Sequence, residues 1–433
     1  MRTDLDNCAA LAHLRPLFPP ELYDRIFLVG GAVRDLLLDK ESVDLDLVVA
    51  LPQKELTTRR FRKVEPKDAP PILLYHSAAV GKVEATCIAG VSELENDLRR
   101  RDFTVNALAL DLEGTLYDPL GGVNDLNLRQ LRPCSTSIFS TDPTRLFRAF
   151  RFAAGGWTLT PQTMALIESE EWNERLQLLP IERFSTEMVK ALAQPQPDRF
   201  FALMLQFNVG RNLLPELFRM PQIPAGPPEH HPEGDLFTHN CEVLASMVAQ
   251  NIEPLARFCA FFHDLGKLAT NPALYPKHHG HDDAGFAMAP AFCNRLALPA
   301  TWRTALAWSS RLHGPANRWQ ETRDSTRIRI AAGAIKGRIA EILPLLTAAD
   351  WPEGPGMPDW PLALAAARLS SAQLGISSAQ LEKLAPAERG ALILQKRIEY
   401  LRRVRREDLA SPRPEDPLGP KGEGGRRPGE GER

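Results

Sequence analysis

The sequence predicts an α+β chain, in which a small domain of mixed strands and helices precedes a long all-helical part. Two observations carry this prediction. Up to about residue 140, short apolar runs such as Ile26–Val29 alternate with helix-like stretches and turn residues. From about Thr141 onward, apolar residues recur with the period of an α-helix instead, as they do in Arg145–Ala154.

Composition narrows the class of protein. The chain has 433 residues, of which 44% are apolar and 24% charged, as expected for a globular protein of about three domains. Its 52 basic and 54 acidic side chains give a net charge of −2, so a polyanion has to meet local basic patches. No apolar run approaches about 18 residues, the first residues are acidic, and the six cysteines show no paired spacing. We therefore expect a reduced, cytoplasmic protein without a membrane span.

The elements follow in order. Strands are expected at Ile26–Val29, Val43–Val49, Ile72–His76 and Val83–Ile88, with a helix at Ala32–Leu38. The predicted domains are a head at 1–140, a helical neck and body at 141–220, a second helical domain at 236–351 and a helical region at 362–410. Five prolines and two glycines make 219–235 a linker or a long rigid loop. The last segment, 411–433, contains eleven Pro or Gly residues and is expected to be disordered.

The first group of candidate functional residues lies near the front of the chain. Gly30-Gly31 stands at a strand-to-helix junction, where missing side chains let the backbone approach a phosphate. Asp44 and Asp46 share one face of a strand, and two parallel carboxylates repel each other unless a divalent cation lies between them. Metal-assisted phosphoryl or nucleotidyl transfer needs such a pair, and Glu84 is a candidate third carboxylate. The alternative is a glycine loop beside a solvated Asp-x-Asp turn.

These motifs resemble a known family. Leu28–Asp35 together with Asp44–Asp46 resembles the head signature of the polymerase-beta-type nucleotidyltransferases, and in particular the class II tRNA nucleotidyltransferases and the bacterial poly(A) polymerases. Arg100–Ala107 resembles the Arg-Arg-Asp motif of that family, Asp118–Leu126 the segment that follows it, and Thr141–Arg148 its protein template. The resemblance implies a polymerase-beta-like head with a mixed sheet, followed by an all-α neck and body.

The resemblance also implies roles for single residues. Asp44, Asp46 and Glu84 are the expected catalytic carboxylates, with Mg²⁺ on the two aspartates. Asp142 and Arg145 are expected to read the Watson–Crick edge of CTP or ATP, because C and A share an exocyclic amine that a carboxylate accepts. The expected partners are tRNA, CTP and ATP, with neither DNA nor a membrane. The full expected nucleotide-binding set is Gly30, Gly31, Arg34, Arg101, Asp102, Asn106, Asp142, Arg145 and Arg148.

Basic residues cluster locally in this nearly neutral chain. Arg145, Arg148 and Arg151 recur at a spacing of three residues, which places them on one side of a helix facing an anion. Arg59–Lys63 and Arg402–Arg406 are further patches, each of which alone is typical of a solvated face. RNA held by such patches is bound through its phosphates and shape.

A second group of candidates lies among the later helices. Imidazoles and carboxylates that converge from separate helices suit a divalent transition metal with an open position for water. The order of His239, His263, Asp264 and Asp350 resembles the metal ligands of the HD phosphohydrolase superfamily, with His281 and His313 as accessory residues. The alternative is a single core histidine with satisfied hydrogen bonds. His230 and His231 are expected at the surface.

The chain departs from the family between its third carboxylate and the Arg-Arg-Asp motif. Family members that add the terminal A usually carry a longer, arginine-containing loop there, whereas only about thirteen residues separate Thr86 from Arg100, and Ile88 stands in place of an arginine. Thr141 also replaces a glutamate that precedes the template aspartate. The expected function is CCA addition to tRNA together with an HD-type phosphohydrolase activity. The alternatives are an enzyme that adds only CC, a poly(A) polymerase, a non-catalytic RNA-binding homologue, and an HD phosphatase with a vestigial head.

Overall fold

The computed structural model describes residues 8–40, 44–65, 71–77, 81–250 and 253–410. The chain forms two compact units, 1–310 and 311–433, and the division falls within helix α16, Ala300–Asn317. The four domain limits expected from the sequence stay predictions. The expected disordered tail at 411–433 lies outside the described residues.

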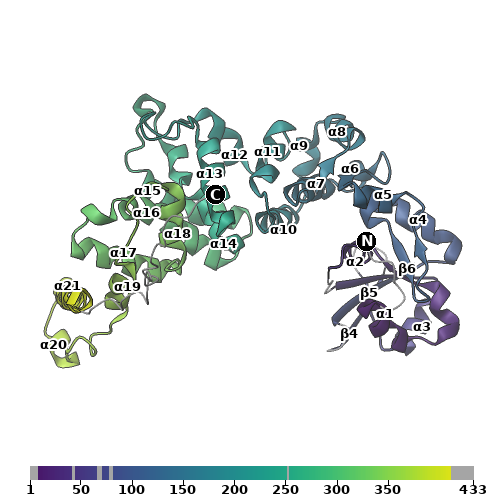
Figure 1. Cartoon of the computed structure of the whole chain (residues 1–433), viewed down its shortest axis with the longest axis horizontal. Helices are drawn as coiled ribbons and strands as arrows, with labels where there is room; N and C mark the ends of the chain where they lie inside the picture. The colour runs from purple at the N-terminus through teal and green to yellow at the C-terminus, as the bar shows by residue number, and fades with distance from the viewer. Residues whose placement is uncertain (1–7, 41–43, 66–70, 78–80, 251–252, 411–433) are drawn as a thin grey trace, which may run out of the picture. The chain divides into compact units, whose positions relative to one another are not determined.

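The first unit begins with a seven-stranded mixed sheet in the order β3-β4-β5-β2-β1-β6-β7. Strands β4, β5 and β6 of this sheet are labelled in Figure 1. Strands β2 and β5 are parallel, and the other neighbouring pairs are antiparallel. A parallel two-stranded sheet, β8-β9, follows. This confirms the α+β class with a mixed sheet in the head. The strands are β1 (Ile26–Val29), β2 (Asp44–Val49), β3 (Arg62–Val64), β4 (Ile72–Ser77), β5 (Gly81–Cys87), β6 (Ala109–Asp111), β7 (Leu116–Tyr117), β8 (Gln130–Leu131) and β9 (Thr158–Leu159).

Strand β1 sends alternate residues to the two faces of the sheet, because successive side chains of a strand point in opposite directions. Leu28 is buried with Val33 of α2 (Gly31–Leu37), whereas Phe27 is buried with Leu98 of α4 (Leu94–Arg99). Helix α2 therefore covers one face and α4 the other. Asp46 pairs in register with Val29 and so projects on the α4 face.

The rest of the first unit is helical. Its core joins the neck to the later helices through phenylalanines, for example where the rings of Phe201 and Phe261 stack with centroids 4.0 Å apart. The helices of this unit besides α2, α4 and α16 are α1 (Ala9–Leu14), α3 (Gln53–Thr58), α5 (Gly122–Asn127), α6 (Ile138–Thr141), α7 (Thr144–Ala154), α8 (Pro161–Glu168), α9 (Trp172–Leu176), α10 (Ile181–Leu192), α11 (Asp198–Gln206), α12 (Pro215–Arg219), α13 (Leu236–Ala249), α14 (Pro254–Phe262) and α15 (His281–Arg295), with the 3₁₀ segment η6 (Leu265–Ala269) after α14.

The proline-rich stretch between α12 and α13 is a rigid loop of the first unit. Ile223 and Ala225 are buried in it, and the amide of Ala225 donates to the carbonyl of Gly234 at 2.9 Å. An isolated bridge between Pro224 and Asp235 closes the loop. Of the two sequence interpretations, a linker or a rigid loop, the structure supports the second.

The second unit is also helical. Asp359 accepts hydrogen bonds from the indole of Trp319 and from Arg327, and both Asp324 and Asp359 bind Arg405 of the last helix. The helices of this unit are the end of α16 followed by α17 (Asp324–Gly337), α18 (Ile342–Asp350), α19 (Trp360–Arg368), α20 (Ser378–Glu382) and α21 (Pro386–Ala410). Among the helices that the structure describes, none is long and apolar enough to span a membrane.

Candidate functional site

A cleft of about 770 Å³ opens in the first unit, between the head sheet and helices α7 and α10. Four stretches that are far apart in the sequence meet in it. These are the Gly30-Gly31 junction, the Asp44–Asp46 strand, the segment from Arg101 to Asn106, and the segment from Asp142 to Phe152. Its further lining residues come from α10 and are Arg183, Thr186, Glu187 and Lys190.

The carboxylates lie on neighbouring parallel strands. Asp44 and Asp46 are exposed on β2 while Leu45 and Leu47 between and after them are buried, as the alternation of a strand requires. Glu84 on β5 stands in register with Asp46, lies outside the set that lines the cleft, and forms an ion pair with its own neighbour Lys82.

The electrostatics of this strand edge favour a cation. Burial raises the pKa of Asp46 above its ordinary value, the guanidinium of Arg101 opposes that rise, and the carboxylates of Glu84 and Asp44 add to it. Asp46 therefore ionises less readily than an aspartate in water. A divalent cation at the same edge therefore removes an existing electrostatic cost.

The glycine junction leaves room for a cationic side chain. Gly30 has a φ of +73°, and a Cβ placed there would lie 2.8 Å from Nη1 of Arg101. Only glycine adopts this backbone conformation without strain and also leaves space for the guanidinium. Nearby, Arg34 donates from Nη1 to Oδ1 of Asn106 at 2.6 Å and from Nε to Asp35 at 2.9 Å, which fixes its position at the cleft wall.

Asp102 is the buried anchor of the cleft. Its carboxylate accepts hydrogen bonds from Arg148 at 2.8 Å, from the amide of Asn106 at 2.9 Å and from the backbone of Phe103 at 2.8 Å. Burial alone raises the pKa of Asp102, but Arg148 and the two other hydrogen bonds outweigh it, so that the pKa falls below its ordinary value. The buried carboxylate is therefore charged and holds helix α7 against the head.

The two predicted template residues are both held by neighbours. Oδ1 of Asp142 accepts from the backbone of Thr144, the first residue of α7, at 3.1 Å, and Oδ2 accepts from Arg183 at 2.8 Å. Arg145 donates from Nη2 to the carbonyl of Arg100 at 2.8 Å. A carboxylate acceptor and a guanidinium donor thus lie on the cleft wall within one turn of α7.

A second cluster of polar residues lies among α13, α14 and η6. His239, His263 and Asp264 are buried, and each offers a ligand atom within 4.8 Å of the others. Nε2 of His263 lies 3.3 Å from Oδ2 of Asp264, and Nε2 of His239 lies 3.6 Å from the same oxygen. This donor set of two imidazoles and one carboxylate is suited to a divalent transition metal.

A lysine and a further histidine approach the carboxylate of this cluster. Lys267 approaches Oδ2 of Asp264 to 2.5 Å and donates to the carbonyl of Ala225 at 2.6 Å, while Nε2 of His281 lies 3.3 Å from Oδ1. Burial raises the pKa of Asp264, but Lys267, His263 and His281 hold it well below its ordinary value. His281 was expected from the sequence as an accessory residue, whereas no role was expected for Lys267.

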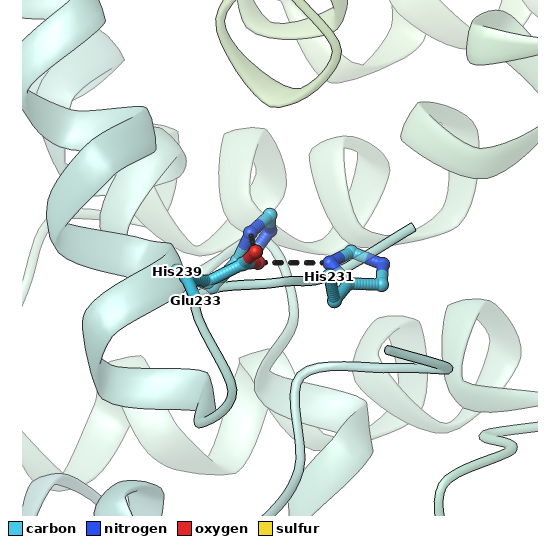
Figure 2. A group of neighbouring side chains, drawn as sticks. All are labelled: His231, Glu233 and His239. Carbon is cyan, nitrogen blue, oxygen red and sulfur yellow. Dashed lines mark hydrogen bonds and ion pairs between the residues drawn. The ribbon is translucent and has the colours of Figure 1, made fainter. Parts of the chain in front are cut away.

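The rigid loop adds an acid to the cluster. Glu233 lies between His239 and His231, and Figure 2 shows its carboxylate facing both rings. Burial raises the pKa of Glu233, and the hydrogen bond from His239 and the other hydrogen bonds lower it to about 2. His230 is exposed as expected. The expectation of a surface position for His231 is wrong, because the hydrogen bond to Glu233 and the packing of the loop keep its ring half-buried.

Known proteins match the same regions. The poly(A) polymerase head domain family matches residues 26–70 and 55–132, and a family described as a probable RNA and SrmB-binding site of polymerase A matches residues 156–220. The multifunctional CCA protein of Methylococcus capsulatus is 36% identical over 346 residues, which cover 75% of this chain and 81% of the relative. That of Halorhodospira halophila is 35% identical over 363 residues, which cover 76% and 86%. This chain belongs to the family of the multifunctional CCA proteins.

Solved structures of CCA-adding enzymes share the fold. The Bacillus stearothermophilus CCA-adding enzyme in complex with CTP matches with a TM-score of 0.65 at 19% identity, over 95% of this chain and 100% of that one. The Thermotoga maritima CCA-adding enzyme complexed with tRNA matches with a TM-score of 0.59 at 20% identity, over 92% and 98%. The likeness supports a head with a mixed sheet followed by a helical body.

The α10 side of the cleft was missed by the sequence analysis. Arg183, Glu187 and Lys190 follow one another at spacings of four and three residues, which places them on one face of a helix. Arg151 of α7 donates to Glu187 at 2.5 Å, which joins the two helices that form this wall of the cleft. The sequence does show these charged residues as a stripe on one face of a helix whose other face is apolar. It does not indicate which element the stripe faces.

The short segment before the Arg-Arg-Asp motif is helical. After β5 the chain forms a 3₁₀ turn and then α4, whose Leu94 and Leu98 are buried against the sheet. Ile88, where the family has an arginine, packs on the same cluster, and its amide donates to the carbonyl of Val49 at 2.9 Å. The segment is therefore attached to the head rather than extended into the cleft.

Two predicted residues belong to the second unit. His313 lies near the end of α16, and Asp350 is the last residue of α18. Within this unit Asn317 donates to Oδ2 of Asp350 at 2.7 Å. Their expected roles stay predictions.

Proposed function

We propose that the chain is a template-independent nucleotidyltransferase that adds C and A to the 3′ end of tRNA from CTP and ATP. The observation that carries this proposal is the meeting of four distant sequence segments in one cleft lined by acidic and basic side chains. The names of the two curated relatives, and the CTP and tRNA bound to the solved neighbours, support the choice of substrates.

Asp44 and Asp46 are proposed to hold Mg²⁺, with Glu84 as the third carboxylate. The residues fit a divalent cation, because their carboxylates lie on one face of the neighbouring strands β2 and β5, where burial and then the like charges of Glu84 and Asp44 raise the pKa of Asp46. When bound, the cation activates the attacking 3′-hydroxyl and stabilises the charge of the leaving pyrophosphate.

The remaining residues bind and orient the nucleotide. Arg101 and the side-chain-free Gly30 are proposed to receive the triphosphate, and Asn106 the ribose, next to the charged anchor Asp102. Holding the α-phosphate and the tRNA hydroxyl in one geometry supplies much of the rate enhancement of such transfers.

Asp142 and Arg145 are proposed to select the base. A carboxylate accepts a hydrogen bond from the exocyclic amine that C and A share, and a guanidinium donates to a ring nitrogen or carbonyl. U and G present a carbonyl at the position of that amine, so the carboxylate finds no donor there. Because Arg183 occupies Oδ2 and Thr144 binds Oδ1, the carboxylate is already oriented before a nucleotide arrives.

The test offers purified full-length protein a tRNA that ends at the discriminator base. We expect CTP alone to extend it by two residues, ATP alone to be incorporated poorly, and both together to complete the end. Extension by a long run of A with ATP alone would instead identify a poly(A) polymerase.

We further propose a metal-dependent phosphohydrolase activity at His239, His263 and Asp264. The converging buried donors support it, since two imidazoles and one carboxylate leave coordination positions for water and a phosphate ester. His263→Ala should remove hydrolysis of a 2′,3′-cyclic nucleotide and leave CTP incorporation unchanged. The proposal would be contradicted if wild-type protein hydrolysed the cyclic nucleotide in the presence of EDTA and the His263→Ala variant hydrolysed it as fast as wild type.

A further inference from the structure

One carboxylate oxygen of Glu233 serves two imidazoles. Oε1 lies 2.8 Å from Nδ1 of His239 and 2.9 Å from Nδ1 of His231, and the two rings meet edge to face with centroids 5.0 Å apart (Figure 2). Because an ionised carboxylate only accepts hydrogen bonds, both imidazoles donate from Nδ1. The contact therefore fixes their tautomers.

The tautomer decides which nitrogen of His239 can bind a metal. A neutral imidazole that carries its proton on Nδ1 has its lone pair on Nε2. In His239 that nitrogen is the one 3.6 Å from Oδ2 of Asp264. Glu233 thus turns the coordinating atom of His239 toward Asp264.

His263 reaches the same arrangement through the backbone. Its Nδ1 lies 2.8 Å from the carbonyl of Ala260, so that it donates there, and its Nε2 lies 3.3 Å from Oδ2 of Asp264. Both histidines consequently present Nε2 to one carboxylate. One is oriented by a helix carbonyl and the other by a side chain of the rigid loop.

Two alternative metal positions share His239. His231, Glu233 and His239 offer ligand atoms within 4.8 Å of one another, as do His239, His263 and Asp264. A neutral imidazole has one lone pair, so His239 serves one position only. Both Nδ1 atoms lie at hydrogen-bond distance from one oxygen of Glu233, so Glu233 acts as a hydrogen-bond acceptor there. The lone pair of His239 is then on Nε2, which favours the metal position formed with His263 and Asp264.

We propose that Glu233 is the positioning residue of a metal centre formed by His239, His263 and Asp264, and that His231 steadies Glu233. This inference rests on the proposed phosphohydrolase function. A carboxylate behind a metal-bound histidine fixes the ring and makes it a better ligand, and removing such a partner typically lowers metal affinity 10–100-fold.

Contacts within the loop and with Lys267 restrict the position of Glu233. The ring of His231 lies against Gly226, where an added Cβ would lie 2.1 Å from Cδ2, so that any larger residue would displace the ring. Lys267, which binds Asp264, also donates to the carbonyl of Ala225 in this loop at 2.6 Å. The loop is thereby connected to the metal-binding carboxylate as well as to His239.

The test measures Mn²⁺ binding by calorimetry, together with the Mn²⁺ concentration that gives half-maximal hydrolysis of a 2′,3′-cyclic nucleotide. Both are measured on full-length protein that carries Asp44→Ala and Asp46→Ala, because the Mg²⁺ site proposed for the head would also bind Mn²⁺. We expect Glu233→Ala to weaken binding about 10–100-fold and to raise the half-maximal concentration by the same factor, with most of the rate recovered at saturating Mn²⁺. Glu233→Gln keeps an acceptor oxygen of the same shape and should recover part of the affinity. Glu229→Ala removes an exposed acid of the same loop and serves as the control.

The outcomes separate this inference from the function on which it rests. If the protein with Glu233 intact and the head carboxylates removed binds no Mn²⁺ and hydrolyses nothing, the proposed phosphohydrolase is wrong. If that protein binds Mn²⁺ and its Glu233→Ala variant binds it equally tightly, Glu233 has no positioning role. If Glu233→Ala loses one of two bound ions while hydrolysis persists unchanged, His231, Glu233 and His239 form a metal site of their own, and the proposed role is also overturned.

Discussion

Arg183 of α10 donates a hydrogen bond from Nη2 to Oδ2 of Asp142 at 2.8 Å and so connects α10 to the residue that stands two positions before the start of α7. The guanidinium is about half exposed and the carboxylate less so, with side-chain exposures of 48% and 26%. One oxygen of Asp142 is thereby occupied by a protein donor, and the rotation of the carboxylate is restricted.

Removal of Arg183 should loosen nucleotide selection. In Arg183→Ala the carboxylate of Asp142 can rotate, so we expect a KM for CTP about tenfold higher and increased misincorporation of UTP relative to CTP. Arg183→Lys keeps the positive charge but lacks the planar pair of guanidinium donors, so its KM for CTP and its misincorporation of UTP should lie between those of wild type and Arg183→Ala. Single-nucleotide incorporation kinetics measure both quantities. Glu182→Ala, on the exposed face of the same helix, is the control, and an unchanged ratio of UTP to CTP incorporation would refute the role.

Removal of the carboxylates on β2 should abolish nucleotide addition. Asp44→Ala and Asp46→Ala each delete a proposed ligand of Mg²⁺, and we expect a barrier higher by several kcal/mol, on the order of a thousandfold in rate. Hydrolysis of a 2′,3′-cyclic nucleotide should continue, because it is proposed for a different cluster. Glu113→Ala, which removes an exposed acid in the turn between β6 and β7, should leave the rate unchanged. Residual CTP incorporation by the double variant near the wild-type rate would exclude these residues as ligands.

Loss of Arg148 should destabilise the head and neck in a pH-dependent way. Arg148→Met leaves the buried carboxylate of Asp102 without its cation, and we expect a loss of about 3 kcal/mol in the free energy of unfolding at pH 7, at the low end for a buried pair because Arg148 is partly exposed. Asp102 has a lowered pKa in the folded protein, so its stabilising contribution is complete above the ordinary aspartate pKa of 3.8 and is lost as the pH falls below it.

Urea unfolding at pH 7 and near pH 3 measures this difference. The difference in the free energy of unfolding between wild type and Arg148→Met should be smaller at the lower pH. Protonation of Asp102 removes the ion pair that stabilises the wild-type protein. Arg99→Met breaks an exposed ion pair with Glu95 and should cost less than about 0.5 kcal/mol. An equal deficit at both pH values would mean that Arg148 stabilises the fold by packing alone.

Addition of A should be slower than addition of C. The segment after β5 is short and forms α4, whose Leu94 and Leu98 are buried on the sheet, so it lacks the length and the arginine that a mobile loop needs to shift the template for a larger base. A modest misplacement of the reacting groups costs on the order of a hundredfold in rate. End-sequencing of products from a tRNA ending in CC and one ending at the discriminator base makes the comparison. Equal rates at matched nucleotide concentrations would show that the short segment is sufficient.

The local elements of the head were predictable from the sequence. Strand β2 was expected from the alternation of Asp44, Leu45, Asp46 and Leu47, and the structure has the leucines buried and the aspartates exposed. Helix α7 was expected at Arg145–Ala154 and begins one residue earlier. Such features depend on residues adjacent in the chain, whose periodicity carries the information.

The contacts across elements were not predictable in the same way. Glu233 and His231 stand in a proline-rich stretch that gives no helical or strand signal, and only the folded loop brings them to His239. Arg183 likewise shows a helical charge pattern but not its partner Asp142, which is 41 residues away.

The sequence by itself determined the segments that form β1, β2, β4 and β5, the glycine junction, and the paired carboxylates of β2, because each of these is a property of neighbouring residues and of the backbone conformations they allow. The five shorter strands β3, β6, β7, β8 and β9 were not predicted. The tertiary structure alone decided that Asp102 is buried and ionised beneath Arg148, that α10 forms a wall of the cleft, and that Glu233 faces two histidines. The physical reason is that hydrogen bonding and burial depend on distances through space between segments far apart in the chain, and packing of the whole core fixes those distances.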